Sequence, residues 1–129
     1  MTTPHFAFTK LVVADLDKSA AFYESVFALT VQARIDAVIA GRAITEIVYN
    51  QTAKGGGNFV LLAFHDAPTP AAGEAIIGFV TGEIDATVAR AVAAGGTVLQ
   101  AAADAPQHGI RVGFVADPEG HMIEVLQPL

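Results

Sequence analysis

Hydrophobic residues recur with two periods in the first half of the chain, and the change between them predicts a strand followed by a helix. Residues 8–13 have the apolar character of a strand, and Asp15 can cap the helix that follows. The apolar positions of this helix recur at helical spacing and are Leu16, Ala20, Tyr23 and Phe27. Three further strand-like segments complete this half, at residues 29–32, 44–49 and 58–64.

The second half of the chain repeats this pattern. Residues 76–80 predict a strand, and the helix after it begins near Ile84. That helix ends at Gly95 and Gly96, because glycine is favoured just past a helix C-terminus. Three strand-like segments follow again, at residues 97–100, 110–115 and 121–126. Each half therefore has the order strand–helix–strand–strand–strand.

A constant shift relates the two halves and indicates an internal repeat. Leu16 corresponds to Ile84, a shift of 68 positions (84 − 16), and the same shift brings Phe8 onto Ile76. A repeat of this kind indicates duplication of one unit. We therefore expect an α+β fold with two tandem modules. The predicted organisation is a single domain over residues 1–129, with a first module at about 6–66, a linker at 67–74 and a second module at about 75–129.

Composition narrows the class of partner. Hydrophobic residues make up 53% of the 129 residues, enough for one buried core. The formal net charge of −6 disfavours a nucleic-acid partner, and no apolar run approaches the ~20 residues that cross a bilayer. The absence of cysteine excludes disulfides and thiolate-bound metals. The first residues lack the features of a leader, so we expect a cytoplasmic protein that binds a small molecule.

Three segments together resemble the vicinal oxygen chelate superfamily, which includes glyoxalase I, bleomycin-resistance proteins and extradiol dioxygenases. They read DLDKSAAFY in the first half, AVAAGGTV in the second and DPEGHMIEV near the end. The resemblance implies that each half is a βαβββ module whose sheet curves around a cavity. It also implies four cavity positions that hold metal ligands in the enzymes of the family, one on the first and one on the last strand of each half.

Those four positions can be located in this sequence by counting from the shared motifs. Counting back from the helix starts gives Phe8 and Ile76. Counting four residues on from the glycine before each last strand gives Leu61 and Glu124. A catalytic zinc-type site needs about three protein ligands, and three of these four residues have no lone pair to donate. We therefore expect no metal and no cofactor.

The histidines do not restore a metal site. They are His5, His65, His108 and His121. No two of them are spaced as ligands on one helix or on one strand face, so we interpret them as solvated or turn residues.

The cavity implied by the resemblance is mostly apolar, with Lys10 and Glu124 among aromatic and aliphatic side chains. Strand alternation predicts which residues share a face with Glu124. The predicted ligand-binding residues are Phe8, Lys10, Phe59, Leu61, Ile76, Arg111, Met122 and Glu124. Glu46 is a further candidate for this cavity, with the register of its strand left open.

Glu124 has two interpretations. In the first, it is a scaffold carboxylate paired with Lys10 or Arg111, because an unpaired buried charge costs several kcal/mol. In the second, it meets a donor group of a ligand or acts as an acid–base catalyst. We favour the second interpretation, in which Glu124 faces the ligand, and Glu124 is the candidate catalytic residue.

Two functional classes stay open. The first is a metal-independent module that binds a small aromatic or apolar molecule, as the resemblance to bleomycin-resistance proteins implies. The second is a metal-free isomerase, epimerase or lyase that uses Glu124 as acid and base. A weaker third alternative is a glyoxalase-like metalloenzyme with an unusual ligand set. The resemblance also implies a homodimer.

Overall fold

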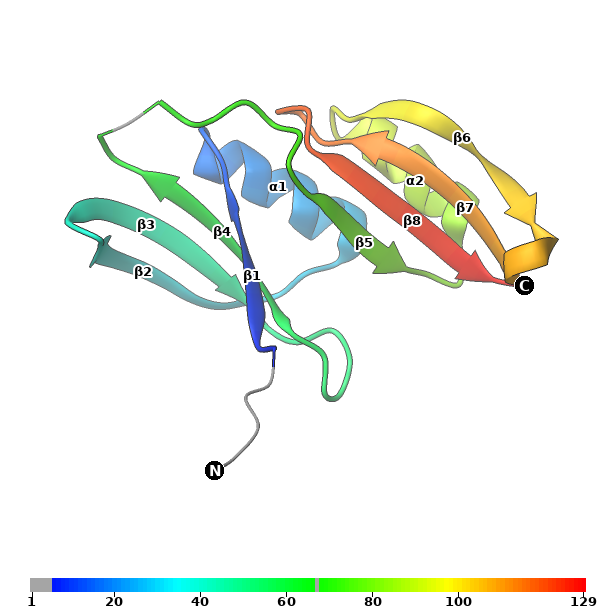
Figure 1. Ribbon diagram of the computed structural model, residues 1–129, viewed down its shortest axis with the longest axis horizontal. Helices are drawn as coiled ribbons and strands as arrows, with labels where there is room; N and C mark the ends of the chain where they lie inside the picture. The colour runs from blue at the N-terminus through cyan, green and yellow to red at the C-terminus, as the bar shows by residue number, and fades with distance from the viewer. Residues whose placement is uncertain (1–5, 67) are drawn as a thin grey trace. The chain divides into compact units, whose positions relative to one another are not determined.

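The computed structural model describes residues 6–66 and 68–129 and contains two four-stranded sheets (Figure 1). The elements of the first half are β1 (Phe8–Val12), α1 (Leu16–Phe27), β2 (Val31–Ile39), β3 (Arg42–Tyr49) and β4 (Asn58–Phe64). Those of the second half are β5 (Ile76–Val80), α2 (Ile84–Ala93), β6 (Thr97–Ala105), a 3₁₀ turn (Pro106–His108), β7 (Ile110–Ala116) and β8 (Met122–Pro128).

The two sheets have the same strand order, which confirms the predicted α+β fold with two βαβββ units. The first sheet runs β1–β4–β3–β2 and the second β5–β8–β7–β6. In each, the first strand is parallel to the last, and the other pairs are antiparallel. β1 and β5 begin 68 positions apart (76 − 8), and α1 and α2 keep the same shift (84 − 16).

The edge strands β2 and β6 are longer than the sequence pattern predicts. Each has nine residues, where the pattern indicated four. Most of their residues are exposed, so the sequence has no alternation of buried and exposed positions from which the ends of these strands could be predicted. The hairpin from β2 to β3 turns at Ala40 and Gly41, which both have positive φ, the backbone geometry of a tight type I′ turn.

The chain forms two compact units, and their boundary runs through α1. The first unit comprises the described part of Met1–Ala20 with Leu29–Pro70, and the second comprises Ala21–Ala28 with Ala71–Leu129. The predicted linker includes residue 67, which lies outside the described residues. The last turns of α1 therefore belong to the core of the second unit.

Aromatic side chains of α1 fill that core. The ring of Phe27 stacks on Phe79 of β5 with centroids 3.8 Å apart, and Tyr23 lies 6.5 Å from the same ring. Phe22 meets Tyr23 edge to face at 5.2 Å. Gly96 allows the backbone at Ala116 to approach closely, because a Cβ at position 96 would lie 2.6 Å from the carbonyl oxygen of Ala116. Tyr23 and Phe27 are among the periodic apolar positions that predict this helix, and the structure places both rings in this aromatic cluster.

A buried polar cluster joins α1 to the turn before β8. Asp117 is 4% exposed and accepts hydrogen bonds from the Tyr23 hydroxyl at 2.8 Å and from the backbone N–H groups of Glu119 and His121, both at 2.9 Å. The Nδ1 atom of His121 also lies 2.8 Å from this carboxylate. Burial, followed by the charge and hydrogen bond of Asp117, raises the pKa of Tyr23 far above its ordinary value. The Asp-Pro-Glu-Gly turn is thus fixed to the helix by one carboxylate.

Tyr23→Phe is expected to lower the free energy of unfolding by about 1.5–3 kcal/mol at pH 7, because a hydrogen bond to a charged group is lost. A tyrosine pKa raised by folding stabilises fully below the unfolded-state pKa of about 10 and less as the pH rises above it. The difference between native protein and variant should therefore shrink above pH 10. Urea unfolding at several pH values measures both effects.

Ser25→Ala is the matched control, because the Ser25 hydroxyl donates only within α1, to the carbonyl of Phe22. It should change stability by about 0.5 kcal/mol or less. Equal effects of the two variants would show that the Tyr23–Asp117 bond does not stabilise the turn.

Candidate functional site

The register of β1 with β4 assigns side chains to the two faces of the first sheet. Lys10 is paired with Val60, and Leu11 with Leu61. Because faces alternate along a strand, Leu61 lies on the face opposite to Lys10. Leu61 is fully buried, and its antiparallel partner Ile47 is 4% exposed.

The predicted placement of Leu61 and Phe59 beside Lys10 is therefore wrong. Phe59 is also on the opposite face and stacks with Tyr49 at a centroid distance of 6.2 Å. The prediction aligned the glycines before the last strands, a shift of 63 positions (120 − 57). The paired strands show a shift of 64, since Phe8 pairs with Asn58 and Ile76 with Met122 (122 − 58). A slip of one residue moves every side chain to the other face.

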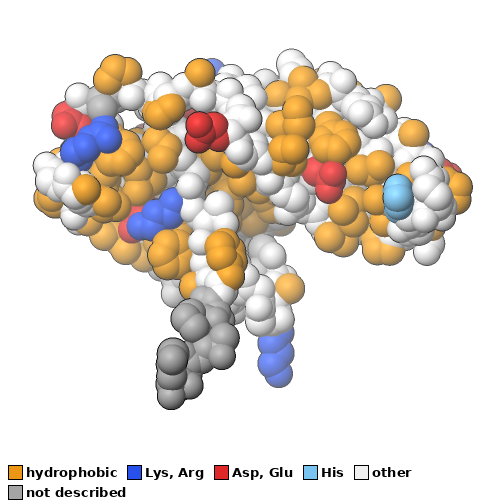
Figure 2. Space-filling view, viewed as in Figure 1, with side chains coloured by type: hydrophobic (Ala, Val, Ile, Leu, Met, Phe, Trp, Pro, Cys, Tyr) orange, Lys and Arg blue, Asp and Glu red, His pale blue; other side chains and the backbone are white. Residues whose placement is uncertain are grey.

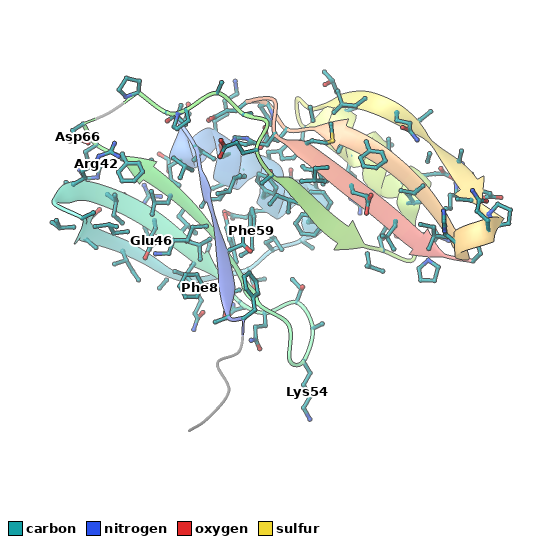
Figure 3. All side chains as sticks on the ribbon, in the orientation of Figure 1. Phe8, Arg42, Glu46, Lys54, Phe59 and Asp66 are labelled. Atoms are coloured by element: carbon teal, nitrogen blue, oxygen red, sulfur yellow. The ribbon has the colours of Figure 1, made fainter. Side chains whose placement is uncertain are left out.

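A pocket opens on the Lys10 face of the first unit. It has a volume of about 180 Å³ and is lined by Phe8, Lys10, Gln32, Glu46, Val48, Asn58 and Val60. Figure 3 shows Phe8 on β1 and Glu46 on β3. The Lys10 ammonium lies 2.8 Å from Glu46 Oε2 and 5.5 Å from the centre of the Phe8 ring. The register of β3 pairs Glu46 with Leu62, which answers the open question of the side on which Glu46 lies.

The open face of the second sheet is apolar around Glu124. Glu124 is paired with Gly78 on one side and with Phe114 on the other. Its neighbours along the strands are Met122, Leu126, Ile76 and Val80, and the last two are 60% and 69% exposed. Hydrophobic side chains gather over β5 and β8 in Figure 2, with an acidic group among them. The predicted shared face of Ile76, Met122 and Glu124 is confirmed.

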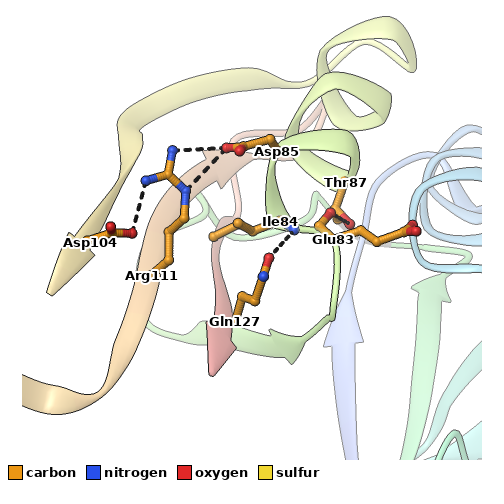
Figure 4. A network of polar contacts seen from close by, with 7 residues as sticks. All are labelled: Glu83, Ile84, Asp85, Thr87, Asp104, Arg111 and Gln127. Atoms are coloured by element: carbon orange, nitrogen blue, oxygen red, sulfur yellow. Dashed lines mark hydrogen bonds and ion pairs between the residues drawn. The ribbon is translucent and has the colours of Figure 1, made fainter. Parts of the chain in front are cut away.

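Neither predicted counter-ion pairs with Glu124. Lys10 is bound to Glu46, and the Arg111 guanidinium contacts Asp85 at 3.1 Å and Asp104 at 3.2 Å (Figure 4). The hydrogen bonds that Arg111 donates to these two carboxylates, the one to Asp85 first, raise the pKa of Arg111. Arg111 is three residues from Phe114 on β7, which places it on the opposite face from Glu124. Arg111 is therefore not a residue of that face, contrary to the prediction.

Glu124 makes no ion pair or hydrogen bond with any residue in the described part of the chain. A Cβ added to its neighbour Gly78 would meet no atom within 4 Å, so there is open space beside the carboxylate. The Gln127 side chain, three residues on, faces the other way and accepts a hydrogen bond from the backbone N–H of Ile84 at the start of α2 (Figure 4). Glu124 is thus an available charge on an apolar surface.

Each of the three histidines that the structure describes is accounted for by other contacts or by exposure to solvent. His5 is outside the described residues. His65 contacts the Thr45 hydroxyl at 2.7 Å, His108 is exposed in the 3₁₀ turn, and His121 is buried against Asp117 rather than solvated. Within residues 6–66 and 68–129, no group of three or more His, Cys, Asp or Glu side chains is arranged to hold a metal ion.

The residues at the four family positions therefore do not supply the set of metal ligands that the enzymes of the family have. On the observed register, the four positions hold Phe8, Val60, Ile76 and Glu124. Only the last of these is a donor, and a lone carboxylate falls short of the three ligands that a catalytic site requires.

The sequence matches the Glyoxalase/Bleomycin resistance protein/Dioxygenase superfamily over residues 3–125, and the chain belongs to this superfamily. None of the curated protein sequences matches the chain. Among the helices that the structure describes, none is long and apolar enough to cross a membrane.

Solved structures agree with this assignment. A glyoxalase family protein from Bacillus cereus superposes with a TM-score of 0.85 at 18% identity, covering 100% of this chain and 97% of that one. A glyoxalase-related enzyme from Fulvimarina pelagi has a TM-score of 0.70 at 30% identity and covers 97% and 88%. TioX from Micromonospora sp. ML1 has a TM-score of 0.68 at 24% identity and covers 98% and 100%.

The corrected register gives a stability prediction. Leu61→Ala should lower the free energy of unfolding by about 2–5 kcal/mol, because Leu61 is fully buried on the packed face and its removal leaves a cavity. Val38→Ala is the control, since Val38 is 70% exposed and should cost about 0.5 kcal/mol or less. Chemical denaturation measures both. A small effect at Leu61 would mean that this side chain lines an open pocket instead.

Proposed function

We propose that this protein binds a small aromatic or apolar molecule without a metal ion, and that the ligand carries a cationic or hydrogen-bond-donating group directed at Glu124. The observation that supports this function is the setting of Glu124, a carboxylate without a partner in the described chain and with open space over Gly78. Small-molecule sites typically combine apolar walls with a few polar groups that fix orientation.

The surrounding side chains supply the apolar part of such a site. Phe114 and Met122 are partly exposed beside Glu124, and Ile76 and Val80 are largely exposed on the neighbouring strand. Exposed apolar patches on soluble domains commonly mark interaction sites. A planar ring could cover these side chains while its polar substituent reaches the carboxylate.

A metal-free isomerase, epimerase or lyase is the second candidate, because an available carboxylate can accept a proton. Proton transfer of this kind usually needs a second acid–base group near the reacting atom. The strand positions paired across the Glu124 row are Gly78, Phe114 and Gln100, and none of them titrates. This favours binding over catalysis on that face.

Glu124→Gln should weaken binding of 4-methylbenzylammonium about tenfold and change the affinity for 4-methylbenzyl alcohol little. The ammonium loses its attraction to an opposite charge, which is about 1–4 kcal/mol for unit charges 4 Å apart. The uncharged alcohol loses only the smaller difference between a charged and a neutral hydrogen-bond acceptor. Stability should change by less than about 1 kcal/mol, since Glu124 has no protein partner to lose. Calorimetric titration and thermal melting provide the two readouts.

Glu74→Gln removes one negative charge at an exposed position and controls for the overall charge. If it weakened the ammonium ligand as much as Glu124→Gln did, the effect would be non-specific. If Glu124→Gln unfolded the protein and left ligand binding unchanged in the folded fraction, Glu124 would belong to the scaffold.

The protein should retain far less than one equivalent of zinc, nickel or manganese after dialysis, because Phe8, Val60 and Ile76 donate no ligand. Elemental analysis of the dialysed protein measures this. Retention of about one equivalent by the native protein, together with its loss in Glu124→Ala, would contradict metal independence.

We also propose a homodimer. The outer strands of both sheets have unpaired edges in the described chain, and β2 exposes Val31, Ile35 and Val38. Such edges are usually covered or paired in native proteins. Light scattering at micromolar concentration should give twice the 13.3 kDa of one chain. A monomer would leave the fold intact and remove the proposed assembly.

A further inference from the structure

The pocket of the first unit contains an ion pair whose carboxylate is mostly removed from water. The side chain of Glu46 is 11% exposed and that of Lys10 is 31% exposed, with 2.8 Å between Lys10 Nζ and Glu46 Oε2. Val48 and Val60 form the apolar floor around them. The pair is electrically neutral, so the pocket presents a positive and a negative group side by side.

Both members of the pair keep unused hydrogen-bonding capacity. An ammonium group has three donors, and one of those of Lys10 is directed at Glu46. The bond uses Oε2 of Glu46, and Oε1 makes no hydrogen bond with the described residues. The pocket therefore offers a free donor and a free acceptor a few ångströms apart.

The amide side chains at the pocket edge extend the same pattern. Asn58 Nδ2 donates to the carbonyl of Tyr49 at 2.7 Å and to Gln32 Oε1 at 3.4 Å. This orientation leaves Asn58 Oδ1 as an acceptor and the Gln32 amide nitrogen as a donor. Gln32 reaches the pocket from β2, at the place where the register of that strand with β3 shifts.

The size and wall of the pocket suit one planar ring. A cavity of roughly 150 Å³ is sufficient to bind benzene, and this one measures about 180 Å³. Phe8 is 53% exposed at its edge and provides an aromatic surface for stacking.

We propose that this pocket binds a neutral planar ring that has an adjacent hydrogen-bond acceptor and donor on one edge, as in a carboxamide or a lactam. The acceptor receives a hydrogen bond from Lys10, and the donor reaches Glu46. A simple anion would meet the charge of Glu46 and a simple cation that of Lys10, so both bind less tightly than the neutral group. This site goes beyond the function proposed for Glu124 and uses only residues of the first unit.

Three probes of nearly equal shape test the charge requirement. Benzamide has both a donor and an acceptor, benzoate has acceptors only, and benzamidine has donors only. Titration of the native protein, followed by NMR, should give benzamide a dissociation constant at least tenfold lower than the other two. The amide resonances of Lys10, Val48 and Val60 should shift, and those of Gly78 and Phe114 should not. Equal affinities, or shifts confined to the second sheet, would overturn the proposal.

Single substitutions should change which probe binds best. Lys10→Met leaves Glu46 uncompensated, so benzamidine should become the tightest ligand. Glu46→Gln leaves Lys10 uncompensated, so benzoate should become the tightest. Lys18→Met and Glu74→Gln are matched controls at exposed positions and should keep the preference for benzamide.

The two pocket variants give independent readouts. Glu46 is the more buried partner, and its substitution is the one more expected to unfold the protein. If Glu46→Gln is too unstable to titrate, Lys10→Met alone decides the test. An unchanged order of the three probes in folded Lys10→Met would show that the ion pair serves only the scaffold and would overturn the proposal.

Discussion

The parallel pairing of the first strand with the last strand in each sheet determines which side chains face outward. Backbone hydrogen bonds between β1 and β4, and between β5 and β8, fix the register, and the alternation of side chains then assigns every residue to one face. A shift of one residue in either pair would exchange the packed and the open faces. The candidate residues, the pocket and the identity of the residues at the four ligand positions of the family all depend on this register.

The two units use equivalent positions for different chemistry. Lys10 and Val60 are paired in the first sheet, and Gly78 and Glu124 are paired in the second. The first sheet thus has a cation whose charge Glu46 balances, and the second has a carboxylate beside a residue without a side chain. One βαβββ unit thus holds a compensated charge pair, and the other holds an available charge. Among the residues that the structure describes, neither surface gathers three or more His, Cys, Asp or Glu side chains that could hold a metal ion.

Much of the fold could be predicted from the sequence, because its strands and helices differ in period. β4 and β5 were predicted with their observed bounds, and the repeat gave the order of the elements. Counting residues from the glycine before β4 could not predict which of its side chains lie on which face of the sheet. The shift between the halves falls from 68 positions at the helices to 64 at the last strands. Intervening segments differ in length by four residues, and neighbouring hydrophobic residues at positions 60–62 give no alternation to correct the count.

The pairing partners of the charged residues needed the three-dimensional structure. Glu46 comes from a strand whose register was open, and only its pairing with Leu62 brings it to Lys10. Asp85 lies 26 residues and Asp104 lies 7 residues from Arg111 in sequence, and both contact its guanidinium group. Sequence reasoning identified Glu124 as unusual because a charge stands within an apolar strand. The structure shows that Glu124 lacks a partner in the described chain, because the two predicted counter-ions, Lys10 and Arg111, bind other carboxylates.

The most direct test of the proposed function is a crystal structure of the complex with 4-methylbenzylammonium. The proposed function predicts the ammonium nitrogen at about 3 Å from the Glu124 carboxylate, with the ring against Phe114 and Met122 and no metal ion between ligand and protein. An ammonium group bound away from Glu124, or a metal ion coordinated by that carboxylate, would contradict it.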